Sequence, residues 1–222
     1  MLSKAQERIL RDVQTKKGRK ERGLFLIEGE KFVREAKHLV EFTFTPRDTN
    51  QFREYVTTET PQSMAAVARI PEFSLEDVLA YDTVVVLDGV QDPGNVGTVL
   101  RACLGFRAAL ILVESADPTN PKVVRASTSA LLKTPWVEMK RAEAEEFFAA
   151  HPRTTYRLEV RGDAIAPDAI AAGKMYLVAG NEGSGISLDV PGTSVRIAHD
   201  KALESLNVAV ATSIVLAQLY RH

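Results

Sequence analysis

Two segments of the chain combine glycine with polar side chains that could hold and orient a small molecule. The first, LDGVQDPGNVGTVLRACLGF at residues 87–106, carries the amide of Asn95 and the guanidinium of Arg101. The second, AGNEGSGIS at residues 179–187, has three glycines in six positions around Glu182. Glycines allow backbone amide and carbonyl groups to approach a ligand closely. The alternative for the second segment is a flexible turn with an exposed carboxylate.

A third segment, ALESLNVAVATSIVLAQLY at residues 202–220, places Ser205 and Asn207 just before an apolar run. Either side chain could cap a helix. A helix this apolar on nearly every face is buried, or packs against a partner subunit.

Asn95 and Arg101 lie within a predicted helix at about residues 94–104. Its apolar stripe, Val96, Val99, Leu100 and Cys103, follows helical spacing. Asn95 and Arg101 fall off that stripe, so packing requires neither. Both a ligand-binding role and a plain role, with Asn95 as a helix cap and Arg101 as a surface charge, stay open at this point.

The pattern from residue 83 onward alternates strands with helices. Short β-rich runs separated by helices predict an α/β fold with a parallel sheet covered on both faces. Ligands of such sheets bind beyond the carboxyl ends of the strands, where we expect the loops at 88–97, 180–187 and 198–207. The strands are expected at 83–88, 108–113, 154–160, 176–180 and 194–198, and the further helices at 121–133, 142–150 and from about 204.

The N-terminal part reads as a separate small α/β unit. An apolar run from residue 24 leads into an amphipathic helix pattern at 29–40, and a helix near 51–55 precedes a short strand within 61–71. Residues 72–82 form the joint. We therefore expect two domains, 1–76 and 82–222.

The charge is balanced overall but concentrated at the N-terminus. The chain of 222 residues has 28 basic and 29 acidic residues, which gives no electrostatic evidence for a nucleic-acid partner. Residues 1–23 hold eight basic residues against three acidic ones, an excess of five, and could bind phosphates. The alternative is a solvated helix followed by a polar turn at Lys17-Gly18-Arg19. The eight are Lys4, Arg8, Arg11, Lys16, Lys17, Arg19, Lys20 and Arg22.

Several common signatures are missing from the sequence. It has no G-x-G-x-x-G after a strand, no Walker loop and no G-x-S-x-G elbow. Its four histidines lack metal-ligand spacing, so we expect no metal. The lone Cys103 cannot form an internal disulfide and is expected in the core. The charged N-terminus and the short apolar run at 208–220 predict a cytoplasmic protein with no membrane partner.

Together and in this order, the three segments resemble the SpoU (TrmH-type) RNA 2′-O-ribose methyltransferases of the SPOUT superfamily. The first segment is similar to the family's first motif, LVAGNEGSGIS to its second, and VRIAHDKALESLNVAVATSIVL to its third. FLIEGEKFVREA and TPQSMAAVARIP resemble the small RNA-binding domain of the ribosomal-RNA branch. The resemblance covers nearly the whole chain.

The resemblance implies a C-terminal parallel-sheet SPOUT domain with a deep trefoil knot and a small N-terminal L30e-like α/β domain. It implies an obligate homodimer that binds S-adenosylmethionine in a bent shape at the subunit junction. By position, the cofactor-binding residues would be Val178, Gly180, Ile197 and Leu206. The residues at the reacting end would be Asn95, Arg101, Glu182, Ser205 and Asn207.

The implied reaction is methylation of a ribose 2′-hydroxyl in RNA, with ribosomal RNA as the expected substrate. Holding the hydroxyl in line with the methyl carbon can lower a barrier by roughly 7 to 11 kcal/mol. Arg101 could bind the neighbouring phosphate and favour the developing alkoxide, while the proton acceptor stays open. The sequence departs from the family at Ala198-His199, where Pro-Met is usual, and at Ser129, where Gly is common, so the cofactor cradle is expected to differ slightly in shape.

Three alternatives stay open at this stage. One is a transfer-RNA 2′-O-methyltransferase, which the N-terminal domain disfavours. Another is a non-catalytic RNA-binding module. The third is a small-molecule enzyme on a flavodoxin-like sheet, which would have no affinity for RNA.

Overall fold

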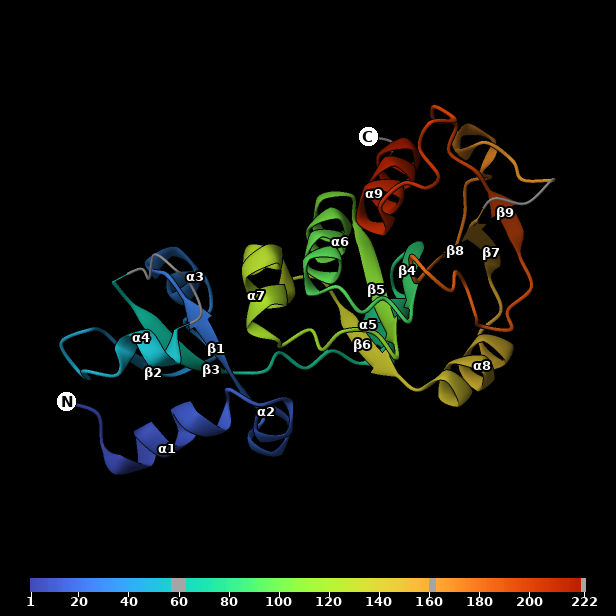
Figure 1. The fold of residues 1–222 in the computed structure, drawn as a ribbon. Coiled ribbons are helices and arrows are strands. Elements are labelled where there is room, and N and C mark those ends of the chain that lie inside the picture. The colour runs from blue at the N-terminus through green and yellow to red at the C-terminus, as the bar shows by residue number, and fades with distance from the viewer. Residues whose placement is uncertain (57–62, 160–162, 221–222) are drawn as a thin grey trace.

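Two separate β-sheets organise the chain, one with three strands and one with six (Figure 1). The computed structural model describes residues 1–56, 63–159 and 163–220. The three-stranded sheet is antiparallel and the six-stranded sheet is parallel. The predicted α/β class with a parallel sheet is confirmed.

The N-terminal sheet has the order β1-β3-β2. The predicted strand near residue 24, the helix near 51–55 and the strand within 61–71 are confirmed as β1, α4 and β3. The elements are α1 (Lys4–Asp12), α2 (Lys16–Arg22), β1 (Leu24–Glu28), α3 (Glu30–Glu35), β2 (Val40–Phe44), α4 (Phe52–Tyr55) and β3 (Ala65–Arg69).

The single helix expected at 29–40 is wrong. Helix α3 ends at Glu35, and strand β2 begins at Val40 and pairs antiparallel with β3. Phe44 at the end of β2 is fully buried among the aromatic side chains of Phe52 and Tyr55. The pairing of β2 with β3 and the burial of Phe44 thus outweigh the helical spacing of apolar residues that continues from α3 up to Val40.

The polar turn expected at Lys17-Gly18-Arg19 is also wrong, because these residues lie inside helix α2. Thr15 caps this helix, its hydroxyl accepting a hydrogen bond from the Gly18 amide at 3.0 Å. Gly23 ends the helix in the left-handed conformation, with a φ of 64°. The helix caps Thr15 and Gly23 lie on either side of the basic residues, and together they favour a helix more than Gly18 within it disfavours one.

The parallel sheet has the order β6-β5-β4-β8-β7-β9. Its predicted strands are confirmed, with ends that differ by a few residues, and β6 was not predicted. The elements of this part are α5 (Leu75–Leu79), β4 (Thr83–Asp88), α6 (Pro93–Gly105), β5 (Ala108–Val113), α7 (Pro121–Ser127), the 3₁₀ helix η1 (Thr128–Leu132), β6 (Trp136–Met139), α8 (Arg141–Ala150), β7 (Thr154–Leu158), the 3₁₀ helix η2 (Pro167–Ala169), β8 (Met175–Gly180), β9 (Thr193–Val195) and α9 (Val208–Leu219).

The helix expected at 121–133 is divided. Helix α7 ends at Ser127, and Thr128 has a positive φ of 53°, after which the chain continues as η1. Helices α6 and α7 pack closely here, because a Cβ added to Gly97 would lie 2.5 Å from the Cβ of Ala126. The closing helix begins at Val208, four residues later than the expected start.

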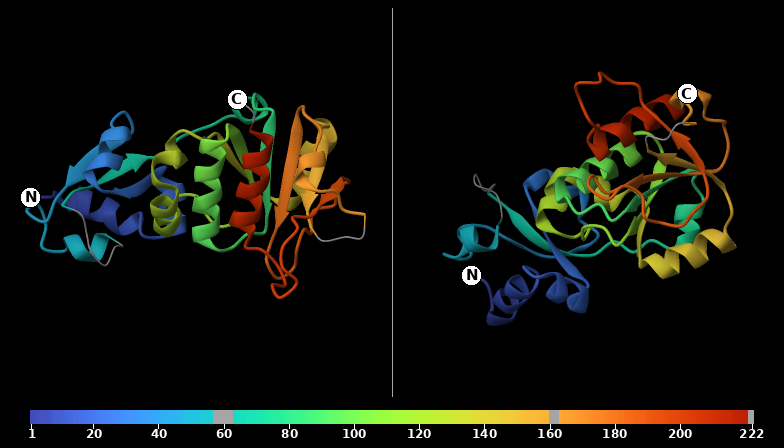
Figure 2. Two further views of the ribbon diagram at one scale, coloured as in Figure 1. Left: turned by 90° about the horizontal axis from the view of Figure 1, so that it is seen from above. Right: turned by 45° about the vertical axis from the view of Figure 1, so that its right-hand side comes forward.

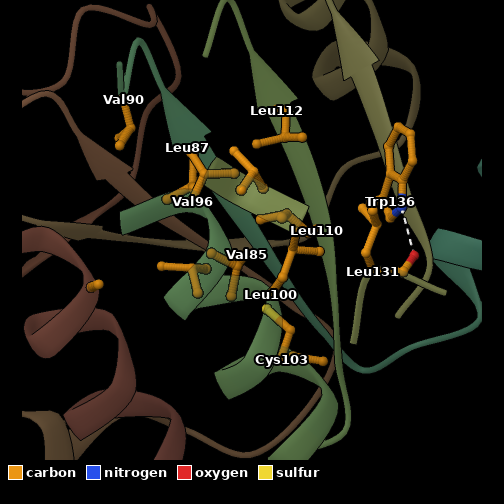
Figure 3. Packing of buried hydrophobic residues seen from close by; sticks show 14 of the residues in the cluster. Val85, Leu87, Val90, Val96, Leu100, Cys103, Leu110, Leu112, Leu131 and Trp136 are labelled. Atoms are coloured by element: carbon orange, nitrogen blue, oxygen red, sulfur yellow. Dashed lines mark hydrogen bonds between the residues drawn. The ribbon is translucent and has the colours of Figure 1, made fainter. Parts of the chain in front are cut away.

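Helices cover both faces of the parallel sheet. Helices α7, α6 and α9 lie side by side on one face (Figure 2), where Leu87 and Leu110 join α6 in one hydrophobic core (Figure 3). Val86 and Ile111 point to the opposite face and pack against Phe148 of α8. The strands are buried on both faces, which explains why their sequence is continuously apolar.

Cys103 lies in the core on the buried face of α6, as expected (Figure 3). Burial raises the pKa of its thiol, so the thiol stays protonated and unreactive at neutral pH. Among the described residues, no helix is long and apolar enough to cross a membrane. Those residues also contain no cluster of three or more potential metal-ligating side chains.

A buried ion pair joins the N-terminal part to the parallel-sheet part. Arg19 of α2 is 3% exposed, and its Nη2 lies 2.6 Å from Oδ2 of Asp117 in the loop after β5. Its Nε donates to the Thr119 hydroxyl at 3.1 Å, and its Nη1 to the Val13 carbonyl at 3.0 Å. Arg19 therefore connects two parts of the protein and does not offer its charge to a phosphate.

Asp117 should make stability depend on pH in the acid range. Burial tends to raise the pKa of Asp117, but hydrogen bonds from Thr119 and Arg19 outweigh it, and the pKa is lowered. Stabilisation from a lowered pKa is present above the unfolded value and is lost as the pH falls through the folded value. The contribution of Asp117 should therefore disappear below about pH 4.

We predict that Asp117→Asn lowers the free energy of unfolding by about 3 kcal/mol at pH 7, because it leaves the buried Arg19 charge unpaired. Urea unfolding followed by circular dichroism measures this, and the difference from wild type should shrink as the pH falls below 4. Glu21→Gln is the control, because it breaks only the exposed pair with Lys17 and should cost under about 1 kcal/mol. A pH-independent difference would contradict the assignment.

Candidate functional site

The three polar segments meet beyond the carboxyl ends of β4 and β8. The Asn95 side-chain amide donates to Oε1 of Glu182 at 2.6 Å. The Asn207 amide donates to Oδ1 of Asn95 at 2.9 Å and lies 3.4 Å from the same Glu182 oxygen. Asn95 thus forms one hydrogen-bonded group with residues 87 and 112 positions further along the chain, called here the polar trio.

The side-chain amide nitrogens of Asn95 and Asn207 are not used to cap helices and can donate hydrogen bonds within the polar trio. Asp92 caps α6, its Oδ1 accepting from the Asn95 backbone amide at 2.8 Å, so the alternative role of Asn95 as a helix cap is wrong. Asn207 caps α9 through Oδ1, which accepts from the amides of Ala209 and Val210. Its Nδ2 stays available to donate to Asn95.

The glycine-rich loop between Gly180 and Leu188 is held by hydrogen bonds at several points. Asn181 and Gly185 exchange backbone hydrogen bonds at 3.0 and 2.8 Å. The Asn181 side chain donates to the Gly89 carbonyl at 3.0 Å. A Cβ on Gly180 would lie 2.2 Å from the Gly185 backbone, so no other residue fits there. The alternative of a loose turn is therefore not what the structure contains.

Asp88 fixes the far end of this loop and was missed in the sequence. Its carboxylate is 1% exposed, and Oδ2 accepts from the amides of Ser187 at 2.5 Å and Leu188 at 2.8 Å. Its Oδ1 lies 2.8 Å from Nη2 of Arg141, and the hydrogen bond to Asp88 raises the pKa of Arg141. The sequence signal that could have predicted this role is the carboxylate at the end of the otherwise apolar run at 83–88.

A cavity of about 260 Å³ adjoins the polar trio. Its walls are mostly apolar and come from the ends of β7 and β8, from β9 and from the segment before α9. Five of the nine predicted site residues line it: Gly180, Glu182, Ile197, Ser205 and Leu206.

Val178 does not line this cavity. It is fully buried in the core on the α8 face of the sheet, so its side chain is part of that packing. Of the two departures from the family pattern, His199 lines the cavity. Ser129 lies instead on the rim of a second cavity, where its hydroxyl hydrogen-bonds Glu35 and helps to lower the pKa of that carboxyl, after the larger effect of Lys133.

Arg101 is separated from the polar trio. It follows Asn95 by six positions on α6, which places it about 9 Å further along the helix axis. It is exposed and lines the second cavity, which lies between α3 and α7. One copy of the chain therefore does not bring Arg101 into the first cavity.

Helix α9 is only partly covered. It packs on α6, while Val210 in its first turn and Leu203 in the segment before it are each 48% exposed. Of the two expectations for this helix, complete burial within one copy is wrong, and packing against a partner stays a prediction.

Residues 82–217, more than half of the chain, match the SpoU rRNA Methylase family. The 23S rRNA (guanosine(2553)-2′-O)-methyltransferase RlmP of Bacillus subtilis is 30% identical, over 93% of this chain and 92% of its own length. A 23S rRNA (adenosine(1067)-2′-O)-methyltransferase of Streptomyces laurentii is 32% identical over 72% of this chain and 62% of its own length.

Solved structures share the whole architecture. The AdoMet-bound rRNA methyltransferase from Sinorhizobium meliloti superposes with a TM-score of 0.87 at 24% identity, covering 99% of this chain and 95% of its own, which shows the common fold. A TrmH-family structure from Porphyromonas gingivalis gives 0.83 at 28% identity, covering 99% and 98%. The sheet and the site define a SPOUT-type α/β protein. The chain belongs to the SpoU rRNA methylase family.

We predict that Asn95 and Asn207 are energetically coupled. Asn207→Ala removes a helix cap and should lower the free energy of unfolding by about 1 kcal/mol. The loss of unfolding free energy in the double variant Asn95→Ala/Asn207→Ala should differ from the sum of the two single losses by about 0.5 kcal/mol or more. The reason is that the two side-chain amides share a hydrogen bond. Urea denaturation of the four proteins measures the coupling.

Asn120→Ala provides the matched control. Asn120 caps α7 in the same way, its Oδ1 accepting from the Lys122 amide at 2.9 Å, without a hydrogen bond to Asn95. Its combination with Asn95→Ala should be additive. Equal coupling in both pairs would reject the polar trio as an energetic unit.

Proposed function

We propose that this protein transfers a methyl group from S-adenosylmethionine to a ribose 2′-hydroxyl in ribosomal RNA. The observation that carries the proposal is the polar trio at the mouth of a mostly apolar cavity, built from the three segments that resemble the family motifs. The named activities of the relatives in B. subtilis and S. laurentii support the same reaction and substrate class.

The residues of the first cavity fit this cofactor. Its apolar side chains, such as Ile197 and Leu206, suit an adenine ring, and the backbone of the glycine-rich loop can approach a ligand closely. The carboxylate of Glu182 also lines it and would favour a cationic ligand, whereas Glu159 is paired with Arg157 at 3.0 Å and Arg196 lines the cavity as well. Bound there, the cofactor would supply an electrophilic methyl group on a sulfonium.

The polar trio would orient the reacting end. Asn95 and Asn207 would hold the Glu182 carboxylate in place through their hydrogen bonds and present neutral donors to the ribose. Ser205 would offer a hydroxyl at the same rim. In the transfer, the ribose oxygen bonds to the methyl carbon as the carbon–sulfur bond breaks, and the hydroxyl proton leaves to an acceptor that we do not assign. Val178 would contribute only through its backbone, since its side chain is in the core.

Arg101 would act from a second copy of the chain. It lies on a separate cavity, so a homodimer that faces α6 and α9 toward a partner is needed to bring it to the neighbouring copy's cofactor cavity. The exposed Val210 and Leu203 at the N-terminal end of α9 support an interface there. A guanidinium at that point would bind the phosphate beside the target ribose and stabilise the developing alkoxide.

The domain division 1–76 and 82–222, the trefoil knot of the second domain, the L30e-like character of the first and the cytoplasmic location belong to this proposal. Each of the two sheets lies within one of these ranges, which supports the division. The chain superposes on the P. gingivalis structure over 99% of its length, which supports the same chain path at the C-terminus.

The RNA-binding surface at the N-terminus would lie on α1. Lys17, Lys20 and Arg22 lie in ion pairs with acidic residues, and Arg19 is buried. Lys4, Arg8 and Arg11 are exposed or half-buried, and their spacing of four and three places them on one face of α1. Of the eight basic residues in 1–23, this stripe is therefore the proposed phosphate contact.

We predict that Arg101→Ala abolishes methylation but leaves S-adenosylmethionine binding unchanged. In the proposed site the side chain contacts the RNA phosphate and the developing alkoxide and not the cofactor, so its loss should slow methyl transfer by two or more orders of magnitude and leave cofactor binding intact. Calorimetry with the cofactor and tritium transfer to ribosomal RNA from a strain lacking the gene measure the two effects. Wild-type protein that folds but binds no cofactor would reject the enzyme and favour an RNA-binding module.

Mixing Arg101→Ala with Asn207→Ala tests whether the site is shared. Mixed dimers would contain one intact site, with Arg101 from one copy and Asn207 from the other. About a quarter of the wild-type activity should return after random subunit exchange. A mixture as inactive as its components would contradict the shared site.

We predict that replacing Lys4, Arg8 and Arg11 with Gln weakens RNA affinity and flattens its salt dependence. Each lost phosphate contact should lower the slope of log K against log salt by about 0.7 to 0.9. Filter binding at several salt concentrations measures the slope. The control replaces Lys140, Lys174 and Arg107, which are exposed and belong to the parallel-sheet part, and should leave the slope near that of wild type.

A further inference from the structure

The second cavity, of about 450 Å³, lies where the N-terminal sheet meets α6 and α7. Lys31 and Phe32 of α3 line one wall, and Arg101 of α6 with Val124 and Arg125 of α7 lines the other. We call this cavity the inter-sheet cleft. It is distinct from the cofactor cavity, because the two share no lining residue.

The charges on the cleft favour an anion. Lys31, Arg101 and Arg125 contribute three cations, against the carboxylates of Glu28 and Glu35. Lys133 further neutralises Glu35, its Nζ lying 2.6 Å from Oε2. A phosphate is the anion that suits a guanidinium, through bidentate hydrogen bonds.

The interior of the cleft is apolar and suits a flat ring. Leu26, Phe32 and Val124 contribute apolar surface beneath the charged groups. The volume lies in the range of small-ligand sites, so it admits one unstacked base. Single-stranded RNA offers such bases for stacking on aromatic side chains, whereas the bases of a duplex remain stacked within the helix.

Ion pairs hold the two walls in place. The Lys133–Glu35 contact joins η1 to α3 across the cleft, and Ser129 adds a hydrogen bond to the same carboxylate. The buried Arg19–Asp117 pair fixes the two parts of the protein on another side. The cleft is therefore formed before any ligand binds, which lowers the entropic cost of binding.

We infer that the inter-sheet cleft binds the RNA nucleotide adjacent to the methylated one, with its base against the half-buried Phe32 and its phosphate on Lys31 and Arg125. The inference rests on the proposed function, because Arg101, which lines the same cleft, is assigned to the phosphate beside the target ribose. The cleft thus selects single-stranded RNA with a displaced neighbouring base.

The test compares Lys31→Gln/Arg125→Gln with Lys37→Gln/Lys122→Gln. The control residues are exposed, lie just after α3 and within α7, and do not line the cleft. Fluorescence anisotropy of full-length protein with labelled dodecauridylate RNA should show about tenfold weaker binding for the first variant. Its salt slope should fall by about 1.4, at about 0.7 for each lost phosphate contact. The control should bind within twofold of wild type.

Three results would overturn the inference. They are an unchanged salt slope in the cleft variant, an equal loss in the control, and a 12-base-pair RNA duplex that binds more tightly than the single strand with the same dependence on Lys31 and Arg125. Should the double variant not fold by circular dichroism, Lys31→Gln alone should weaken binding and lower the salt slope by about 0.7, for its one lost phosphate contact. Cofactor calorimetry separates the two proposals: wild-type protein without cofactor binding or methylation refutes the function, whereas intact activity with an unchanged slope refutes the cleft alone.

Discussion

The carboxylate of Asp88 is the constraint on which the site depends. It ends the central strand β4, is almost completely buried, and receives two backbone amides from the end of the glycine-rich loop and the guanidinium of Arg141. A buried carboxylate must be compensated in this way, because leaving it unpaired costs about 3 to 5 kcal/mol, a large part of the stability of a domain. The loop after β8 is consequently held against β4, and Glu182 within it reaches Asn95.

The polar trio depends in turn on helix capping. Asp92 caps α6, and Asn207 caps α9 with the oxygen of its amide only. The Asn207 cap leaves the amide nitrogen of the side chain to donate to Asn95. Local backbone satisfaction and long-range site assembly therefore use the same side chains, which ties the stability of α9 to the geometry of the cavity.

Arg101 and the polar trio lie at two separate cavities of one copy of the chain. The first cavity combines apolar walls and the glycine-rich loop with Glu182 and Arg196, and the inter-sheet cleft combines its three cations with Glu28 and Glu35. The proposed cofactor site and the proposed RNA contact therefore occupy separate cavities of one copy of the chain.

The sequence by itself determined the class of fold, most of the strands and the three segments of the site. Continuous apolar runs such as 83–88 leave little freedom, since a strand buried on both faces must look like this. The meeting of Asn95, Glu182 and Asn207 followed from parallel strands that end at one edge of the sheet. Tertiary structure alone decided that β2 is a strand, that Arg19 pairs with Asp117, that Val178 belongs to the core and that Arg101 lies on another cavity. These outcomes depend on contacts between residues far apart in the chain, whose energies exceed any local preference, and local spacing does not encode them.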